Sequence, residues 1–215
     1  MKGTSVTTAV SQGREARRLS TLLEVSQALS GTLNLKSALH RVLEVLAKHH
    51  GAIRSMVTLL REGGELYVEA SDGLDRPAQN VQYRMGEGIT GRVVETAKPI
   101  VVPRVSREPT MLNRAARRSD GDDQEISFVC VPVVLNRRAV GALGVDMRYK
   151  AERDFDSSVK FFGVVATMCA RRSPCTGTDE PDAGGRTNRR SEPLIPPSQT
   201  AGPDSSSASP RSLPM

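Results

Sequence analysis

Apolar residues recur at helical spacing in three segments of the chain. The first begins at Arg14 and ends at Gly31, and the second begins at Asn34, a helix-capping residue type, and ends before Gly51. A third helix is predicted over 154–172, because acidic residues near its start and two arginines at its end complement the helix dipole. The apolar faces comprise Leu19, Leu22, Leu23, Ser26 and Leu29 in the first helix, Leu35, Leu39, Val42 and Leu46 in the second, and Val159, Phe162, Val165, Ala166 and Cys169 in the third.

Shorter apolar runs between these helices predict antiparallel strands. Two strand pairs are expected, 52–60 with 65–71 and 126–135 with 139–146. The first pair turns at Glu62-Gly63-Gly64 and the second at Asn136-Arg137. Apolar residues occupy both faces of 126–135, so we expect this strand in the middle of the sheet, with a bulge or break at Pro132, which has no N–H to donate. The pattern predicts an α+β fold with a central antiparallel sheet of five or six strands.

The segment 81–103 combines a strand, a glycine-rich turn, a short helix and a second strand. Its glycines have the G-x-G-x-x-G spacing of a dinucleotide-binding turn: Gly86, Gly88 and Gly91. Such a turn requires a buried strand before it and a long helix after it. Here the preceding residues alternate like a half-exposed strand, and Pro99 ends the helix after two turns. The segment therefore argues against a Rossmann fold.

Three strings of this sequence, in order, resemble GAF domains, the small sensor modules of signalling proteins: 86–103, 125–133 and 141–146. They are similar in particular to the amino-terminal sensor domain of NifA-type activators, which are nif-specific and work with sigma-54 polymerase. The resemblance covers about residues 19–172. It implies a GAF fold in which the amino- and carboxy-terminal helices pack on one face of the sheet and a pocket lies on the other.

Composition limits the classes of partner. The net charge is +6, but aromatic residues make up only 3% of the 215 residues and the arginines are scattered among acids, so we expect no direct binding of nucleic acid. No apolar run is long enough for a membrane span and no secretion signal is visible, so we expect no membrane association and a cytoplasmic location. The cysteines, Cys130, Cys169 and Cys175, lack metal-site spacing and suit a reducing compartment.

Three regions are expected along the chain: residues 1–13 without order, a GAF domain over 14–172, and a tail over 173–215 without order. The tail is rich in proline and has no aromatic residue, so it cannot offset an ordering entropy of about 1–2 kcal/mol per residue. The activators resembled continue into an ATPase core and a helix-turn-helix, whereas no G-x-x-x-x-G-K-[ST] phosphate loop occurs here. We therefore expect a frameshifted or truncated product.

The ligand pocket is expected beneath the helix 86–97 and the loop 103–125. Free amides at the start of that helix favour anions, and guanidinium groups pair bidentately with carboxylates. The resemblance implies control by a small effector such as 2-oxoglutarate or by contact with a PII-type regulator. In the alternative interpretation the glycines serve packing and the arginines face solvent. The candidate ligand-binding residues are Gly88, Thr90, Arg92, Arg104, Asn113, Arg114 and Phe128.

The expected function is that of a regulatory module of a nif-specific transcriptional activator, with no ATPase, DNA-binding or other enzymatic activity and no cofactor. The expected partners include a full-length activator and a second copy of this chain; the leucines of the first helix form either a dimer seam or core. The histidines, His40, His49 and His50, lack further ligands nearby, so no metal site is expected. Two alternatives stay open: a GAF enzyme that reduces free methionine sulfoxide with paired thiols, and a sensor of another small molecule such as a cyclic nucleotide.

Overall fold

The computed structural model describes residues 4–74, 81–111 and 125–172. In these ranges the elements are α1 (Thr4–Ser30), α2 (Leu35–His50), β1 (Ala52–Leu60), β2 (Glu65–Asp72), β3 (Gln82–Arg84), α3 (Gly88–Thr96), β4 (Ile100–Val102), the 3-10 turn η2 (Val105–Arg107), β5 (Ile126–Leu135), β6 (Arg138–Arg148) and α4 (Phe155–Ala170). The chain divides into the units Met1–Thr178 and Asp179–Met215, and all of these elements belong to the first. The predicted tail, 173–215, lies outside the described residues.

The strands form one antiparallel sheet in the order β3-β2-β1-β6-β5-β4. This arrangement confirms the predicted α+β class, with β5 inside the sheet. Both predicted hairpin turns are present, since Gly63 and Gly64 have φ of 105° and 81°, and Asn136 and Arg137 have φ of 49° and 66°. Consecutive positive φ values match the twist of the strands that such a turn joins.

Pro132 is accommodated inside β5 without a bulge at the proline itself. It lies opposite Ala142, and the shift in register falls between Val133 and Val134. Strand β4 pairs only with Phe128–Cys130. Pro132 therefore lies beyond the end of β4, where its missing N–H removes no hydrogen bond to that strand. The predicted irregularity is present but displaced by one residue.

Helix α2 begins and ends at the predicted capping residues, and α4 begins after one of the acidic residues predicted near its start. The Asn34 side chain accepts a hydrogen bond from the Ser37 amide at the start of α2, and Gly51 ends that helix with φ of 64°. At the start of α4, the Asp154 side chain accepts from the Ser157 amide. These local interactions satisfy amides that the helices themselves leave unpaired.

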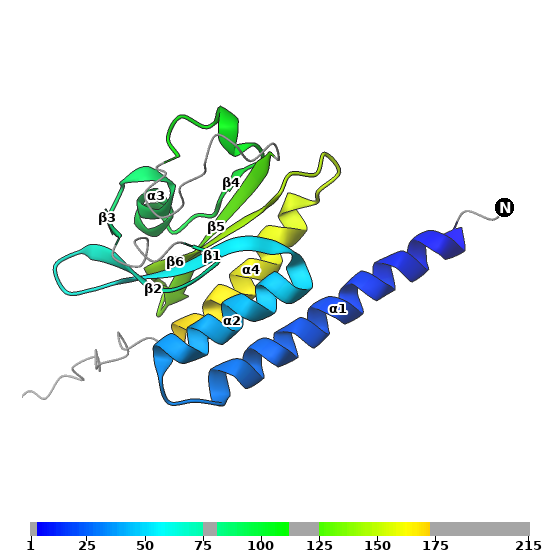
Figure 1. The fold of residues 1–215 in the computed structure, drawn as a ribbon, viewed down its shortest axis with the longest axis horizontal. Coiled ribbons are helices and arrows are strands. Elements are labelled where there is room, and N and C mark those ends of the chain that lie inside the picture. The colour runs from blue at the N-terminus through cyan, green and yellow to red at the C-terminus, as the bar shows by residue number, and fades with distance from the viewer. Residues whose placement is uncertain (1–3, 75–80, 112–124, 173–215) are drawn as a thin grey trace, which may run out of the picture. The chain divides into compact units, whose positions relative to one another are not determined.

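The sheet separates two apolar layers, and the helices that were predicted to share one face do lie on the same side of the sheet. Helices α2 and α4 cover one face, with α1 packed against these two helices, and α3 covers the other face (Figure 1). The larger layer includes the fully buried side chains of Val25, Leu39, Leu43, Leu46, Phe162 and Val165. The smaller layer, beneath α3, includes Met56, Leu66, Ile89, Val93, Phe128 and Cys130. Successive residues of a strand point to opposite faces of the sheet, so β1 and β6 each contribute side chains to both layers.

Helix α1 differs from the prediction in two respects. It begins at Thr4 rather than near Arg14, because each residue added to an existing helix gains a hydrogen bond and no proline interrupts the segment. Its buried face carries Thr21, Val25 and Leu29. The side chains of Leu19 and Leu23, which we assigned to one face with Leu29, are 64% and 61% exposed. These two leucines therefore do not belong to the core.

Candidate functional site

The predicted site begins at the glycine-rich turn that leads into α3. Gly86 and Gly88 have φ of 77° and 59°, a region that favours glycine. Gly91 has an ordinary φ but no space for a side chain, since a Cβ there would lie 2.2 Å from the Arg84 carbonyl oxygen. The turn thus brings the start of α3 onto the end of β3. Gly91 has the packing role that the alternative interpretation gave it, whereas Gly88 allows the backbone to enter α3.

Two predicted site residues, Thr90 and Phe128, lie in the apolar layer beneath α3. Thr90 is 5% exposed, and its side chain lies near the Cys130 thiol, whose pKa it lowers. The Phe128 ring lies over Gly144, where a Cβ would come within 3.0 Å of the ring. Both side chains therefore form the floor of this face, and neither is exposed to solvent.

The thiols of this domain are shielded. Cys130 is fully buried, and burial raises its pKa to about 12 although the Thr90 hydroxyl opposes that shift. Cys169 lies in the helical layer, and burial raises its pKa to about 12 as well. A thiolate is the attacking species in cysteine chemistry, so neither residue is prepared for it at neutral pH. Cys175 lies outside the described residues.

The two predicted arginines among the described residues, Arg92 and Arg104, have different environments. Arg92 lies exposed on α3. The Arg104 guanidinium stacks over the Tyr149 ring, 4.5 Å from its centroid, and its Nη2 donates to the Tyr149 hydroxyl at 3.0 Å. Arg104 is therefore held at the end of the sheet by the residue that follows β6. Asn113 and Arg114 lie outside the described residues.

A charged pair that we did not predict lies on the same face. Arg54 of β1 and Asp146 of β6 are direct partners in the sheet, and the Arg54 Nε donates to Asp146 Oδ2 at 3.0 Å. Their side chains are 17% and 4% exposed. The sequence holds one signal for this pair, an aspartate that ends an otherwise apolar strand. Its partner lies 92 residues away, and only the strand register brings the two together.

Two hollows lined by described residues lie elsewhere. A groove of about 300 Å³ separates the start of α2 from β2, and His40 lies in it with its Nδ1 3.1 Å from the Ser71 carbonyl oxygen. A second hollow, of about 370 Å³, lies along β2 and β3 and is lined by Glu65, Arg84 and Glu87 among others. Neither hollow includes a residue of the predicted site. The candidate site is therefore the face of the sheet beneath α3, together with the charged residues at its margin, Arg54, Asp146 and Arg104.

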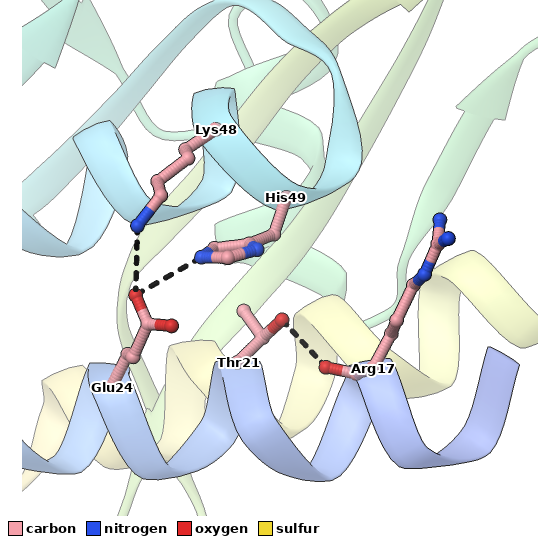
Figure 2. Close-up of polar contacts among 5 residues, drawn as sticks. All are labelled: Arg17, Thr21, Glu24, Lys48 and His49. Carbon is pink, nitrogen blue, oxygen red and sulfur yellow. Dashed lines mark hydrogen bonds and ion pairs between the residues drawn. The ribbon is translucent and has the colours of Figure 1, made fainter. Parts of the chain in front are cut away.

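The opposite face carries a polar connection between helices. Figure 2 shows the Glu24 carboxylate of α1 between Lys48 and His49 at the end of α2. The Glu24 oxygen lies 3.0 Å from His49 Nε2 and 3.7 Å from Lys48 Nζ. One turn earlier in α1, the Thr21 hydroxyl donates to the Arg17 carbonyl oxygen of the same helix. Charged side chains thus connect α1 to α2 at the margin of the helical layer.

Comparisons with known proteins agree with this architecture. A family model described as GAF domain matches residues 32–171. The chain is 36% identical over 153 residues to the nitrogen fixation protein VnfA of Azotobacter vinelandii, covering 70% of this chain and 29% of that protein. It is 38% identical over 164 residues to the Nif-specific regulatory protein of Azospirillum brasilense, covering 74% and 26%. The chain therefore spans less than a third of the length of these relatives.

Solved structures share the fold at low identity. The A. aeolicus nlh2 GAF domain in an inactive state superposes with a TM-score of 0.65 at 21% identity, covering 74% of this chain and 96% of that one. The free methionine-R-sulfoxide reductase of Neisseria meningitidis gives a TM-score of 0.60 at 18% identity, covering 72% and 87%. At these identities the likeness concerns the fold alone. Among the described residues, no helix is long and apolar enough to cross a membrane.

Proposed function

The chain belongs to the GAF domain family, and we propose that it is the regulatory sensor module of a Nif-specific activator of nitrogen-fixation genes. The observation that carries this proposal is the identity of 36–38% over 70–74% of the chain to a protein named as a nitrogen fixation protein and to one named as a Nif-specific regulatory protein. Neither name is that of an enzyme. The module would act in the cytoplasm, on the activity of an activator's other domains.

The two-layered architecture supports such a role. Gly144 and Asp146 of β6 face the α3 layer, whereas Val145 and Met147 face the helical layer. A ligand that moves β6 on one face therefore changes the packing of α2 and α4 on the other. A close-packed interior transmits a displacement of β6 to the helices, because its side chains move between discrete packing arrangements and do not absorb the displacement gradually.

Two kinds of input fit this module. A small carboxylate such as 2-oxoglutarate suits the basic margin of the α3 face, where Arg54 and Arg104 lie half-buried. A PII-type regulator or a full-length activator would instead contact an outer surface. Helix α1 suits self-association, because it continues past the ends of α2 and α4 (Figure 1) and exposes Leu19 and Leu23.

The enzyme alternative rests on likeness of fold to a methionine-R-sulfoxide reductase. That chemistry requires an accessible thiolate and a resolving thiol. Both cysteines in the described residues are buried and have raised pKa values. The regulatory function is therefore the better supported of the two.

A domain exchange tests the proposal. The region of the Azospirillum brasilense regulator that matches this chain would be replaced by residues 14–172, and expression from a nif promoter would be measured with and without fixed nitrogen. We expect the chimaera to activate the promoter and to respond to nitrogen status. A chimaera that is stable in the cell but active to the same extent under both conditions would refute the sensor role.

A further inference from the structure

The Arg54 side chain lies on the α3 face of the sheet. Strand residues two apart point to the same face, and Met56, two residues after Arg54, belongs to the layer beneath α3. The sheet partner of Arg54 is Asp146, which lies two residues after Gly144. Gly144 faces the same layer, because a Cβ there would touch the Phe128 ring. Arg54 and Asp146 therefore continue the row of positions that forms the floor of the candidate site.

Among the described residues, the contact that holds the Arg54 guanidinium is made at its Nε. Its Nε donates to Asp146 Oδ2 at 3.0 Å, and the side chain is 17% exposed. Its stem is confined by Gly73, where a Cβ would lie 3.3 Å from Arg54 Cγ and 2.3 Å from the Ile53 carbonyl oxygen. In the described part of the chain, neither Nη atom has a hydrogen-bond or ion-pair partner. The side chain is thus fixed in direction while two of its nitrogen atoms remain available.

The other arginines near this face are arranged differently. Arg104 already donates to the Tyr149 hydroxyl and stacks on that ring. Arg92 is exposed on α3, where a long side chain loses rotamer freedom on binding and water screens its charge. Arg54 combines partial burial with a fixed orientation, which strengthens pairing to an anion and lowers its entropic cost.

From this geometry we propose that the Nη edge of Arg54 binds the carboxylate of a small anionic ligand on the α3 face. The planar pair of N–H donors matches the two oxygens of a carboxylate. Asp146 is a positioning residue, because it holds Nε and leaves the Nη edge to the ligand. This inference rests on the proposed sensor function and identifies the group that would recognise the effector.

Binding to the full chain tests the inference, with 2-oxoglutarate and succinate as carboxylate probes and inorganic phosphate as the comparison. Amide shifts and calorimetry would measure affinity at millimolar concentrations. Removing Arg54 alone takes away the ion pair that Arg54 makes with the buried Asp146 carboxylate, which endangers folding. We therefore choose Arg54→Lys, which keeps the charge, and the double variant R54Q/D146N, which keeps an uncharged polar pair. Arg138→Gln, at an exposed position at the start of β6, is the matched surface control.

We expect wild-type protein to bind a carboxylate probe, Arg54→Lys to bind about tenfold more weakly because bidentate geometry is lost, and the double variant not to bind. Arg138→Gln should bind like the wild type. Asp146→Asn provides a readout that a purely structural role would not change. Its amide oxygen still accepts from Nε while its negative charge is gone, so we expect carboxylate affinity at least equal to wild type and a larger rise in Tm on adding ligand.

Undiminished binding by Arg54→Lys or by the folded double variant would overturn the inference, and so would a wild-type protein that binds neither carboxylate. Phosphate binding tighter than carboxylate binding would overturn the ligand class. The domain exchange is independent of these results. A nitrogen-responsive chimaera together with absent carboxylate binding would leave the sensor function standing and remove only the role of Arg54.

Discussion

The imidazole of His50, at the end of α2, lies against the Phe161 ring of α4 with the ring centroids 4.0 Å apart and the planes inclined by 27°. Its Nε2 is buried and has no hydrogen-bond partner in the described part of the chain. Burial lowers the pKa of His50 to about 4, and the charges of Arg18 and His49 act in the same direction. The packed ring is therefore neutral, and protonation opposes the contact between α2 and α4.

This relationship predicts a loss of stability in mild acid. The pKa of His50 in the fold lies below its ordinary value of 6.5, so the unfolded chain binds the proton more tightly. The contribution of neutral His50 to the free energy of unfolding is fully present above pH 6.5 and is lost as the pH falls toward 4. Discounted for partial exposure, it amounts to about 2 kcal/mol. Urea unfolding measured across this range should show the decrease.

Substitution of His50 by leucine should reduce this pH dependence by about 2 kcal/mol, because leucine keeps the apolar contact and does not titrate. His40→Gln is the control, since the His40 side chain is 50% exposed. That variant should retain the wild-type profile. If His50→Leu lost stability with acid as steeply as the wild type, the pH dependence would have to come from other groups.

The contact of Glu24 with Lys48 and His49 predicts a local effect on α1. Glu24→Gln removes the negative charge but keeps the size of the side chain. Because the Glu24 side chain is 34% exposed, the change in the free energy of unfolding should be about 0.5 kcal/mol and should diminish at high salt. Hydrogen exchange should accelerate in α1 more than in α2.

Glu44→Gln is the matched control for that experiment. Glu44 pairs with His40 within α2 at 3.5 Å, and in the ranges that the structure describes it has no ion pair with a second helix. Its substitution should leave exchange in α1 unchanged. Equal acceleration of α1 in both variants would show that the contact made by Glu24 does not hold the helices together.

Two glycines in helices should respond in opposite ways to alanine. At Gly91, a Cβ would lie 2.2 Å from the Arg84 carbonyl oxygen, so α3 must move away from β3. We expect Gly91→Ala to lower the free energy of unfolding by about 2 kcal/mol or more. At Gly163, inside α4, a Cβ meets no atom within 4 Å, so Gly163→Ala should add about 0.5–1 kcal/mol. Thermal unfolding of both variants compares the two sites directly, and a destabilised Gly163→Ala would contradict the packing described for α4.

Local chemistry in the sequence was sufficient to predict much of this fold. Helix α2 begins after Asn34 and ends at Gly51, and both limits could be predicted because capping depends only on neighbouring residues. The turn at Asn136 is equally local, because it depends on two consecutive positive φ values. The Arg54–Asp146 pair could not be predicted in this way, because it depends on the register between β1 and β6. The exposure of Leu19 could not be predicted either, because it depends on which side of α1 faces the neighbouring helices. Leucines occur on two sides of α1, so the sequence does not specify which side is buried.

The exposed leucines of α1 predict self-association. Leu19 and Leu23 lie one turn apart, on the side opposite the buried residues Thr21 and Val25. Burying two leucines against a second copy gains about 1.5–3 kcal/mol for each side chain. Replacing both by glutamate should shift the chain toward monomer in sedimentation velocity, while circular dichroism stays unchanged because neither side chain belongs to the core. Leu33→Glu is the control, since Leu33 is 99% exposed in the loop after α1 and should not affect association. A wild-type chain that is monomeric at the highest accessible concentration would remove this face as a dimer contact and leave it to a different partner.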